Sequence, residues 1–350
     1  MFELIIQNYQ AYERQNSYIY PINSRKRSFM RKNIQQTIPN ILKKLAYLLG
    51  TEIKSRKLEI PEKFGRGYCS GYIFNEHIRM MISNYELNED LIIENPDVNI
   101  LGRMIVFKFQ NIFPRTEVLQ GVEQLKTIPS VLIATSRVNT DAMIPIHTNT
   151  ATINIEVDAY YLNNLFDLSE KSPVLQSLLE NMQPLLFEQI IYPSLQKIVD
   201  EIVTEQVDEA FELFFLRVKA EELICRLLME LEKRDEKYLY PLNIHDIQTI
   251  YKIKEQMLEH LGTPPVIGEL AAYANMSPSK LKRLFKQIFG NSIFSYYQKF
   301  RMKEAARLLK EEKLSVSDVG YELGFTNLSH FSRIFKEHIG MKPKQYSRSY

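Results

Sequence analysis

Two groups of basic and hydroxyl side chains, 50 positions apart, are the residues of this chain best placed to do chemistry. Arg283 and Lys286 in the first group recur as Arg333 and Lys336 in the second. Each group lies in a segment whose apolar residues recur every three or four positions, which is typical of an amphipathic helix. Cationic side chains along the exposed face of a helix can contact phosphates and base edges in the major groove. The repeated spacing therefore indicates two DNA-contacting helices in one chain.

The residues before the first basic group predict a helix-turn-helix element. Asn275 occupies the turn, because asparagine tolerates the left-handed backbone better than most residues. Ser277 is placed to cap the second helix, Pro278 fits its first turn, and Gly290 ends it. The apolar side of the two helices is formed by Val266, Leu270, Ala271, Ala274, Leu281, Leu284, Phe285 and Ile288.

The second copy repeats this arrangement. Gly324 supplies the turn, Asn327 is placed to cap the second helix, and Gly340 ends it before Pro343. Residues 293–309 between the copies predict a connecting helix of about 25 Å, at ~1.5 Å per residue. That length is compatible with the ~34 Å between recognition helices that lie one turn of DNA apart. Because both copies match, merely solvated amphipathic helices are the weaker interpretation. The apolar side of the second copy is formed by Val316, Val319, Leu323, Phe331, Phe335 and Ile339.

The stretch 324–336, followed by Gly340, Pro343 and Tyr346, resembles the signature of the AraC/XylS-type DNA-binding domain of bacterial transcription regulators. The resemblance covers about the last hundred residues. It implies that exposed early positions of each second helix contact bases, while the later lysines meet phosphates. The residues that it assigns to DNA are Ser279, Lys282, Arg283 and Lys286 in the first copy, and Asn327, Ser329, Ser332, Arg333 and Lys336 in the second.

The charge is distributed unevenly along the chain. Residues 251–350 hold 17 Lys+Arg and 9 Asp+Glu, whereas the first 250 residues hold 27 and 33. A basic C-terminal segment on an acidic partner segment fits phosphate contacts from one end only. Double-stranded DNA is therefore the expected partner of the C-terminal part.

The first 240 residues differ from the C-terminal part because they combine helical segments with short β-rich runs. The fold class expected for the whole chain is therefore α+β. Residues 1–60 predict an N-terminal helical segment, with an apolar helical stripe over 34–49. Residues 61–160 predict a small β-barrel or sandwich, and the resemblance favours a cupin-like barrel that binds an effector. Residues 161–240 are interpreted as helical. The expected strands are 72–74, 78–83, 104–109, 131–136 and 152–157, and the expected helices are 175–180, 185–203 and 207–233.

The helix predicted over 207–233 carries an apolar stripe wider than one barrel face requires. Part of that stripe is expected to pack against a second copy of the chain, which makes 161–240 a candidate dimerisation region; the alternative is that all of it covers the barrel. Residues 241–264 read as a linker and a lead-in helix, and 265–350 as the DNA-binding domain with its two helix-turn-helix elements.

Signals of enzymatic or metal chemistry are weak. His77 and His147 are the barrel histidines, 70 positions apart, whereas metal sites need clustered ligands. The sequence Ser277–Lys280 matches a Ser-x-x-Lys pattern, but helix capping explains it. With only Cys69 and Cys225, no disulfide framework is expected, and a reducing cytoplasm is the expected location. No apolar run approaches the ~20 residues of a membrane span, so no membrane partner is expected.

These observations favour a ligand-responsive, sequence-specific transcription regulator with no catalytic residues, metal or cofactor. The resemblance implies that it acts as an activator. The cysteine content and the apolar stripe of 207–233 add the expectation of a cytoplasmic homodimer, and RNA polymerase is an expected partner. Segments around 244–258, 280–283 and 291–297 are similar to a subset of the family that resembles the pyochelin-receptor regulator, which implies an iron–siderophore complex as the small-molecule effector. Two alternatives remain open: a constitutive DNA binder without effector, and a barrel enzyme fused to a DNA-binding domain.

Overall fold

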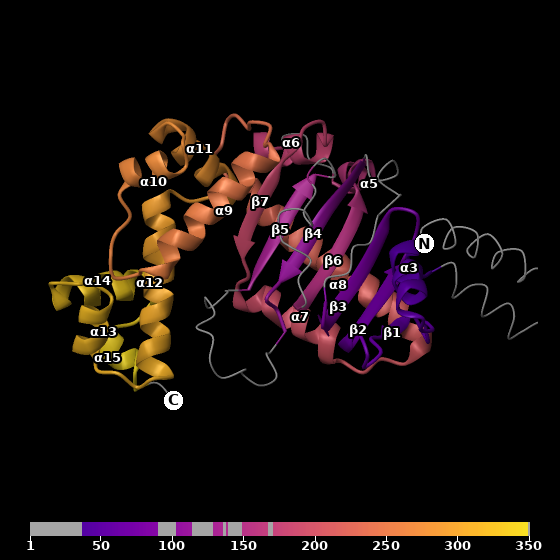
Figure 1. Ribbon diagram of the computed structural model, residues 1–350. Helices are drawn as coiled ribbons and strands as arrows, with labels where there is room; N and C mark the ends of the chain where they lie inside the picture. Colours follow the sequence, from indigo (N-terminus) through magenta and orange to yellow (C-terminus); the bar gives the residue numbers. More distant parts are fainter. Residues whose placement is uncertain are drawn as a thin grey trace, which may run out of the picture.

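The computed structural model describes residues 37–89, 103–113, 129–135, 138, 149–166 and 171–348. Within them, a sheet with helices is followed by an all-helical C-terminal domain, which Figure 1 shows beside one edge of the sheet. The expected α+β class is confirmed. No helix in these ranges is long and apolar enough to cross a bilayer.

The N-terminal domain is built on one seven-stranded sheet in which every neighbouring pair is antiparallel. The strand order is β1-β2-β3-β6-β4-β5-β7. The strands are β1 (Lys57–Glu59), β2 (Gly65–Ile73), β3 (Ile78–Leu87), β4 (Met104–Gln110), β5 (Ser130–Thr135), β6 (Asn149–Asp158) and β7 (Leu186–Ile190). All five expected strands are present, because short runs rich in β-branched and aromatic residues suit a sheet packed in a core.

The expected closure of these strands into a small barrel is not confirmed. In the part of the chain that the structure describes, β1 and β7 are the two edges of the sheet and do not pair with each other. Helices bury the apolar face instead, so no opposite wall of strands is needed to cover it. The sheet therefore remains open.

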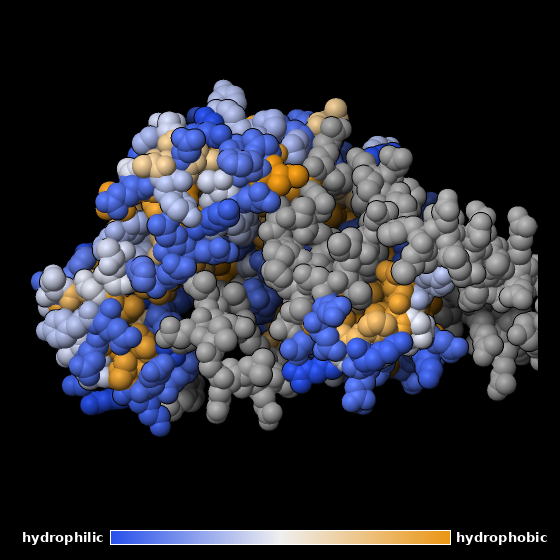
Figure 2. All heavy atoms as spheres, viewed as in Figure 1, coloured by the Kyte–Doolittle hydropathy of each residue, from blue (hydrophilic) through white to orange (hydrophobic). Residues whose placement is uncertain are grey.

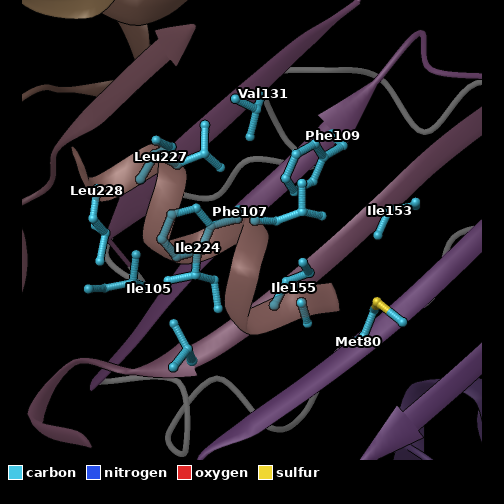
Figure 3. Packing of buried hydrophobic residues seen from close by; sticks show 14 of the residues in the cluster. Met80, Ile105, Phe107, Phe109, Val131, Ile153, Ile155, Ile224, Leu227 and Leu228 are labelled. Atoms are coloured by element: carbon cyan, nitrogen blue, oxygen red, sulfur yellow. The ribbon is translucent and has the colours of Figure 1, made fainter. Parts of the chain in front are cut away.

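Three helices supply most of this cover: α6 (Pro173–Glu180), α7 (Pro193–Thr204) and α8 (Glu209–Glu232). Figure 3 shows Ile224 and Leu227 of α8 against Phe107, which lies on the interior strand β4 and is fully buried. The short α5 (Ala159–Leu165) follows β6, and α3 (Asn40–Leu49) packs in a separate cluster with Leu58 and Cys69. The predicted helix over 34–49 thus begins only after Pro39, and residues 1–36 lie outside the described part.

The helix predicted over 185–203 is wrong in its first part. Leu186–Ile190 forms β7, which pairs with β5, and only Pro193–Thr204 is helical. Pro184 and Pro193 leave a segment too short for a stable helix, and Leu186 and Phe187 find apolar partners on opposite faces of the sheet. Pairing with a strand about 50 residues away therefore decides its conformation.

The C-terminal domain contains α9 (Ile244–Glu259), α10 (Ile267–Tyr273), α11 (Pro278–Phe289), α12 (Ile293–Lys310), α13 (Val316–Glu322), α14 (Leu328–Ile339) and α15 (Pro343–Tyr346). The two helix-turn-helix elements, α10–α11 and α13–α14, and the connecting helix α12 confirm the prediction. Val266 is the exception in the expected apolar stripe: it precedes α10 and is more than half exposed. We call α10–α11 the first reader and α13–α14 the second reader.

The two readers belong to different hydrophobic cores. The first reader shares one cluster with Leu132 and Ala134 of β5 and Leu186 of β7, whereas the second reader packs in its own cluster with the end of α12. Figure 1 shows α9 and α11 beside β7. The sheet is therefore joined physically to the first reader.

A buried carboxylate strengthens this junction. Glu188 on β7 accepts a hydrogen bond from the hydroxyl of Tyr251 at 2.6 Å and from Lys254 Nζ at 3.1 Å. Burial and the neighbouring carboxylate raise the pKa of Tyr251 well above its usual range, so this hydroxyl remains a donor. Glu188 thus ties β7 to α9 at the base of the first reader.

We predict that Glu188→Ala lowers the free energy of unfolding by about 3–5 kcal/mol, because it leaves the partly buried Lys254 without its carboxylate. Urea unfolding measures this value. Glu230→Ala, which removes an exposed pair with Lys233, is the matched control and should change stability little. Equal effects of the two substitutions would show that Glu188 is not a structural anchor.

Candidate nucleic-acid interface

The first reader has the turn and caps that its sequence predicts. Asn275 adopts the left-handed conformation with φ of 49°. The Ser277 hydroxyl accepts a hydrogen bond from the backbone N–H of Lys280 at 3.3 Å, and Pro278 occupies the first turn of α11. Gly290 ends the helix at φ of 68°. These local interactions orient α11 as the second helix of a compact element.

The second helix of the second reader is capped in the same way, but the turn before it is sterically tighter. The Asn327 side chain accepts hydrogen bonds from the backbone N–H groups of Ser329 and His330 at 2.9 and 3.0 Å. Gly324 has φ of 73°, and a Cβ atom there would lie 1.9 Å from the carbonyl oxygen of Gly262. The second turn therefore packs directly against the loop after α9.

The residues assigned to DNA lie on the polar sides of α11 and α14, opposite the buried Phe285 and Phe335. Ser332 and Lys286 are half-buried and the others are exposed. The cations are not all in the same environment: Arg333 pairs with Glu337 one turn along its own helix, at 3.1 Å. The exposed members are Ser279, Lys282, Arg283, Asn327, Ser329, Arg333 and Lys336.

The cations of the first reader contact the segment that follows α8. The Arg283 guanidinium lies 4.0 Å from the centre of the Tyr240 ring, and Lys286 Nζ lies 3.1 Å from a carboxylate oxygen of Asp235. These contacts join positions about 45 residues apart, and no helical periodicity could have predicted them.

The connecting helix α12 is joined through buried polar contacts to the loop after α9 and to the turn of the second reader. The Tyr297 hydroxyl donates a hydrogen bond to the carbonyl oxygen of Leu261 at 2.5 Å. Arg301 is buried, donates through Nε to the carbonyl oxygen of Leu323 at 2.7 Å, and lies 3.7 Å from the centre of the Phe325 ring. Burial lowers the pKa of Arg301. At ~1.5 Å per residue, α12 is about 27 Å long, close to the expected connector.

The sequence pattern did not predict a functional role for Arg301. Its signal was an arginine four residues after Tyr297, on the side of a helix where apolar residues prevail. By satisfying the carbonyl of Leu323 in the second turn, it sets the orientation of the second reader on α12.

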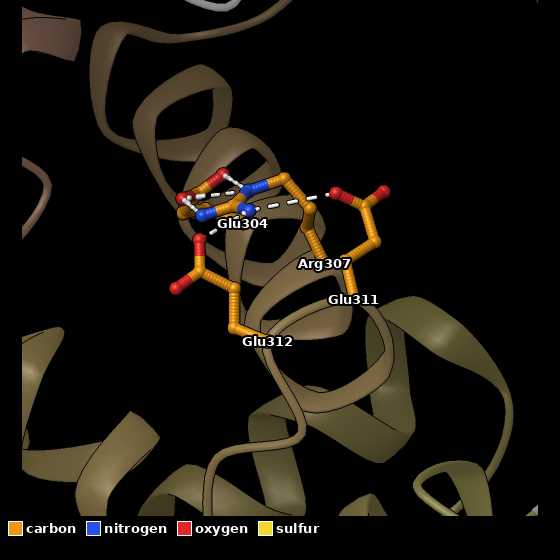
Figure 4. Close-up of polar contacts among 4 residues, drawn as sticks. All are labelled: Glu304, Arg307, Glu311 and Glu312. Atoms are coloured by element: carbon orange, nitrogen blue, oxygen red, sulfur yellow. Dashed lines mark hydrogen bonds and ion pairs between the residues drawn. The ribbon is translucent and has the colours of Figure 1, made fainter.

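A cluster of charged side chains lies at the C-terminal end of α12. Figure 4 shows Arg307 between Glu304 and Glu311 of the helix region and Glu312 of the loop that follows. Hydrogen bonds to Glu304 and Glu312 raise the pKa of Arg307. This cluster stabilises the helix end from which the second reader leaves.

The surface of the C-terminal domain is predominantly hydrophilic on the face that Figure 2 shows, over α9 to α11. Among the described residues, no group of three or more His, Cys, Asp and Glu side chains is placed to hold a metal ion. His77 stacks on Tyr161, with ring centres 4.6 Å apart, while His147 lies outside the described ranges.

Comparison with known proteins identifies the C-terminal segment. Residues 270–349 match the family model described as a helix-turn-helix domain. The transcriptional regulator GbdR of Pseudomonas aeruginosa is 34% identical over 108 residues, which are 31% of this chain and 29% of that protein. The regulatory protein PchR of the same species is 29% identical over 124 residues, which are 35% and 42% of the two chains. This chain thus spans about a third of the length of these relatives.

One similar solved structure is the DNA-binding domain of the transcriptional factor AdpA in complex with a target DNA. It is 27% identical, covers 29% of this chain and 92% of that domain, and has a TM-score of 0.28. The family match lies within the C-terminal domain.

We predict that Gly324→Ala destabilises the protein by more than about 2 kcal/mol, because the left-handed backbone and the contact with Gly262 both exclude a side chain. Gly340→Ala is the matched control: φ is also positive there, at 90°, but nothing lies within 4 Å of the added Cβ, so a cost of about 1–2 kcal/mol is expected. Thermal unfolding followed by circular dichroism compares them. Equal costs would mean that the second turn is not packed on Gly262.

Proposed function

We propose, from the AraC-type helix-turn-helix domain of residues 270–349, that this protein is a sequence-specific DNA-binding regulator of transcription. The observation that carries the proposal is the pair of capped readers, each with an exposed cationic side on its second helix, joined by one rigid helix. Such helices enter the major groove with their N-terminal halves. The relatives named above are themselves transcriptional regulators, which supports regulation rather than catalysis.

In this proposal, Arg283 and Arg333 read bases, and Lys286 and Lys336 contact phosphates. Arginine suits guanine because its planar fork donates two parallel hydrogen bonds to O6 and N7. Lysine contributes charge without base preference, so its contacts set affinity and salt dependence. The exposed hydroxyls and amide, from Ser279, Asn327, Ser329 and the half-buried Ser332, complete the contacts to bases or backbone.

We further propose that the sheet domain binds a small-molecule effector and passes its effect to the first reader. The support is the shared core of β5, β7 and α11, together with the Glu188 anchor. A change in the packing of the sheet edge would move the first reader relative to the second. An iron–siderophore complex remains the effector class that the family resemblance suggests, and activation through RNA polymerase the expected output.

Helix α8 supports the proposed homodimer. Its inner side packs on the sheet, while Phe211 and Phe214 on the outer side are 63% and 70% exposed. Val218 and Met229 continue this exposed stripe at helical spacing, flanked by the pair of Arg217 and Glu221. Two such stripes from two copies would bury each other's apolar side chains, as in a coiled-coil seam.

Selection of DNA from a random pool tests the proposed function. We expect enriched sites with two conserved blocks whose centres lie about one helical turn, ~34 Å, apart. Selection is run at fixed salt, with and without cell extract, so that a required effector is detected. Absence of enrichment under both conditions would contradict sequence reading by this domain.

On a selected site, we predict that Arg283→Ala and Arg333→Ala each cost about 1–3 kcal/mol of binding and relax preference at one base. Lys336→Ala should weaken all sequences alike and reduce the salt slope by about one. Fluorescence anisotropy on matched and mutated sites measures both effects. Arg66→Ala, an exposed arginine on the sheet, is the control. If the arginine variants bind every site like the parent protein, the residue assignment is wrong.

We predict that Phe214→Asp weakens self-association about tenfold or more, because it places a charge in the apolar seam. Sedimentation velocity over a concentration series gives the dissociation constant of the dimer. Tyr238→Asp, at a residue that is 79% exposed and outside α8, should leave association unchanged. A parent protein that stays monomeric with and without DNA would exclude the α8 dimer.

A further inference from the structure

The segment Arg234–Tyr240, which we call the strap, leaves α8 and runs along the first recognition helix α11. Its two ends are fixed to that helix by hydrogen bonds. Arg234 donates to the carbonyl oxygen of Gln287 at 2.9 Å, and the buried Gln287 side chain exchanges two hydrogen bonds with the backbone of Tyr240, at 3.0 and 2.8 Å. The strap is therefore docked on α11 specifically, through donors and acceptors that match.

Between these ends, the strap contacts two of the three cations that the first reader would use on DNA, Arg283 and Lys286, whereas the third, Lys282, is exposed. Tyr240 lies under the Arg283 guanidinium, and Asp235 pairs with Lys286. An aromatic face and a carboxylate are the chemical counterparts of a cation, as are a base edge and a phosphate. Arg283 cannot hold the Tyr240 ring in this geometry and extend to a base at the same time.

The second reader lacks an equivalent cover in the described part of the chain. Arg333 pairs only within its own helix, with Glu337, and Lys336 is exposed. The two readers therefore differ in availability although their sequences match. The strap is one difference between the two elements: their second helices are capped alike, but their apolar sides pack in different cores.

We propose that the strap is an autoinhibitory element, which must leave α11 before the first reader binds DNA. This proposal rests on the proposed DNA-binding function. The second reader is free to bind first, and the strap then competes with DNA for Arg283 and Lys286. Apparent affinity is reduced by the fraction of molecules in which the strap is released.

The docked strap contains groups that favour its release. Both carboxylate oxygens of Glu236 are buried and, among the residues that the structure describes, have no hydrogen-bond partner. Burial also lowers the pKa of Arg234 to about 10, which shows that its cation is poorly solvated there. Release would hydrate both charges, which offsets part of the free energy lost with the hydrogen bonds of the strap.

The strap is also attached to the sheet. The Arg234 guanidinium lies 5.0 Å from the centre of the ring of Phe187, which is fully buried in the core between β7 and the covering helices. The strap begins one turn after the last buried residue of α8, Leu231. A change in packing at β7 or α8 would therefore displace Arg234 first, which connects the sheet domain to the release of the reader.

The experiment compares Tyr240→Ala and Tyr238→Ala in the full-length protein on a selected DNA site at fixed salt. Tyr238 lies in the same segment but is largely exposed, so it is a matched tyrosine control. We expect Tyr240→Ala to tighten DNA binding roughly three- to tenfold, because it removes the cation–π contact that favours the docked strap. Tyr238→Ala should bind like the parent protein.

A fluorescent variant follows the strap itself. The chain contains no tryptophan, so Tyr240→Trp introduces a single probe, and a tryptophan face still holds the Arg283 cation. Its emission should change on addition of the selected DNA and stay constant with an unrelated duplex at the same salt. The emission of Tyr238→Trp should change with neither duplex.

The outcomes separate this proposal from the proposed function. If the parent protein and both alanine variants bind the selected site equally, and the Tyr240→Trp emission does not respond, DNA binding stands and the autoinhibitory strap is overturned. Weaker binding by Tyr240→Ala would overturn it too, since Tyr240 would then position Arg283 for DNA. If no variant binds any DNA, the proposed function itself fails.

Discussion

The structure depends on one shared apolar core, in which the edge of the sheet and the first reader bury each other. Leu132 and Leu186 contribute from the sheet, and α9, α10 and α11 from the C-terminal domain. Separating them would expose apolar surface on both sides, at roughly 25 cal/mol per Å². The buried Glu188, with its partners Tyr251 and Lys254, would also lose its hydrogen bonds. The first reader is therefore part of the sheet domain's packing as much as of the C-terminal domain's.

The second reader is held in place by other contacts. Its core is separate, and its position is set by α12 through Arg301 at the turn and the Arg307 cluster at the helix end. A rigid connector with two differently held readers gives an asymmetric arrangement: the first reader packs against the sheet, and the second is held by α12. This asymmetry arises although the two repeats share the same pattern of caps and cations, and we propose that regulation acts through the strap and the shared core rather than through the repeats.

The sheet domain shows which structural features the sequence pattern alone can predict. The β-rich runs 78–83 and 104–109, and the alternation of Ile153, Ile155 and Val157, predicted strands, each of which has one face in the buried core. The same alternation is compatible with a barrel, a sandwich or an open sheet, since each gives a strand one buried face. Which of the three architectures forms depends on the element that covers the buried face of the strands. In this protein α8 is part of that cover, and its other apolar side faces outward at Phe211 and Phe214.

The sequence by itself determined the two readers, their caps and the connecting helix, because these depend on contacts within about four residues and on backbone preferences of Asn275, Gly324 and Gly340. It also placed the cationic positions on the exposed sides of the recognition helices. Only the tertiary structure decided that Leu186–Ile190 is a strand, that Arg301 is buried at the second turn, and that Tyr240 and Asp235 meet Arg283 and Lys286. Each of these joins residues that are distant in the chain, and their energies become available only once the domains have packed together.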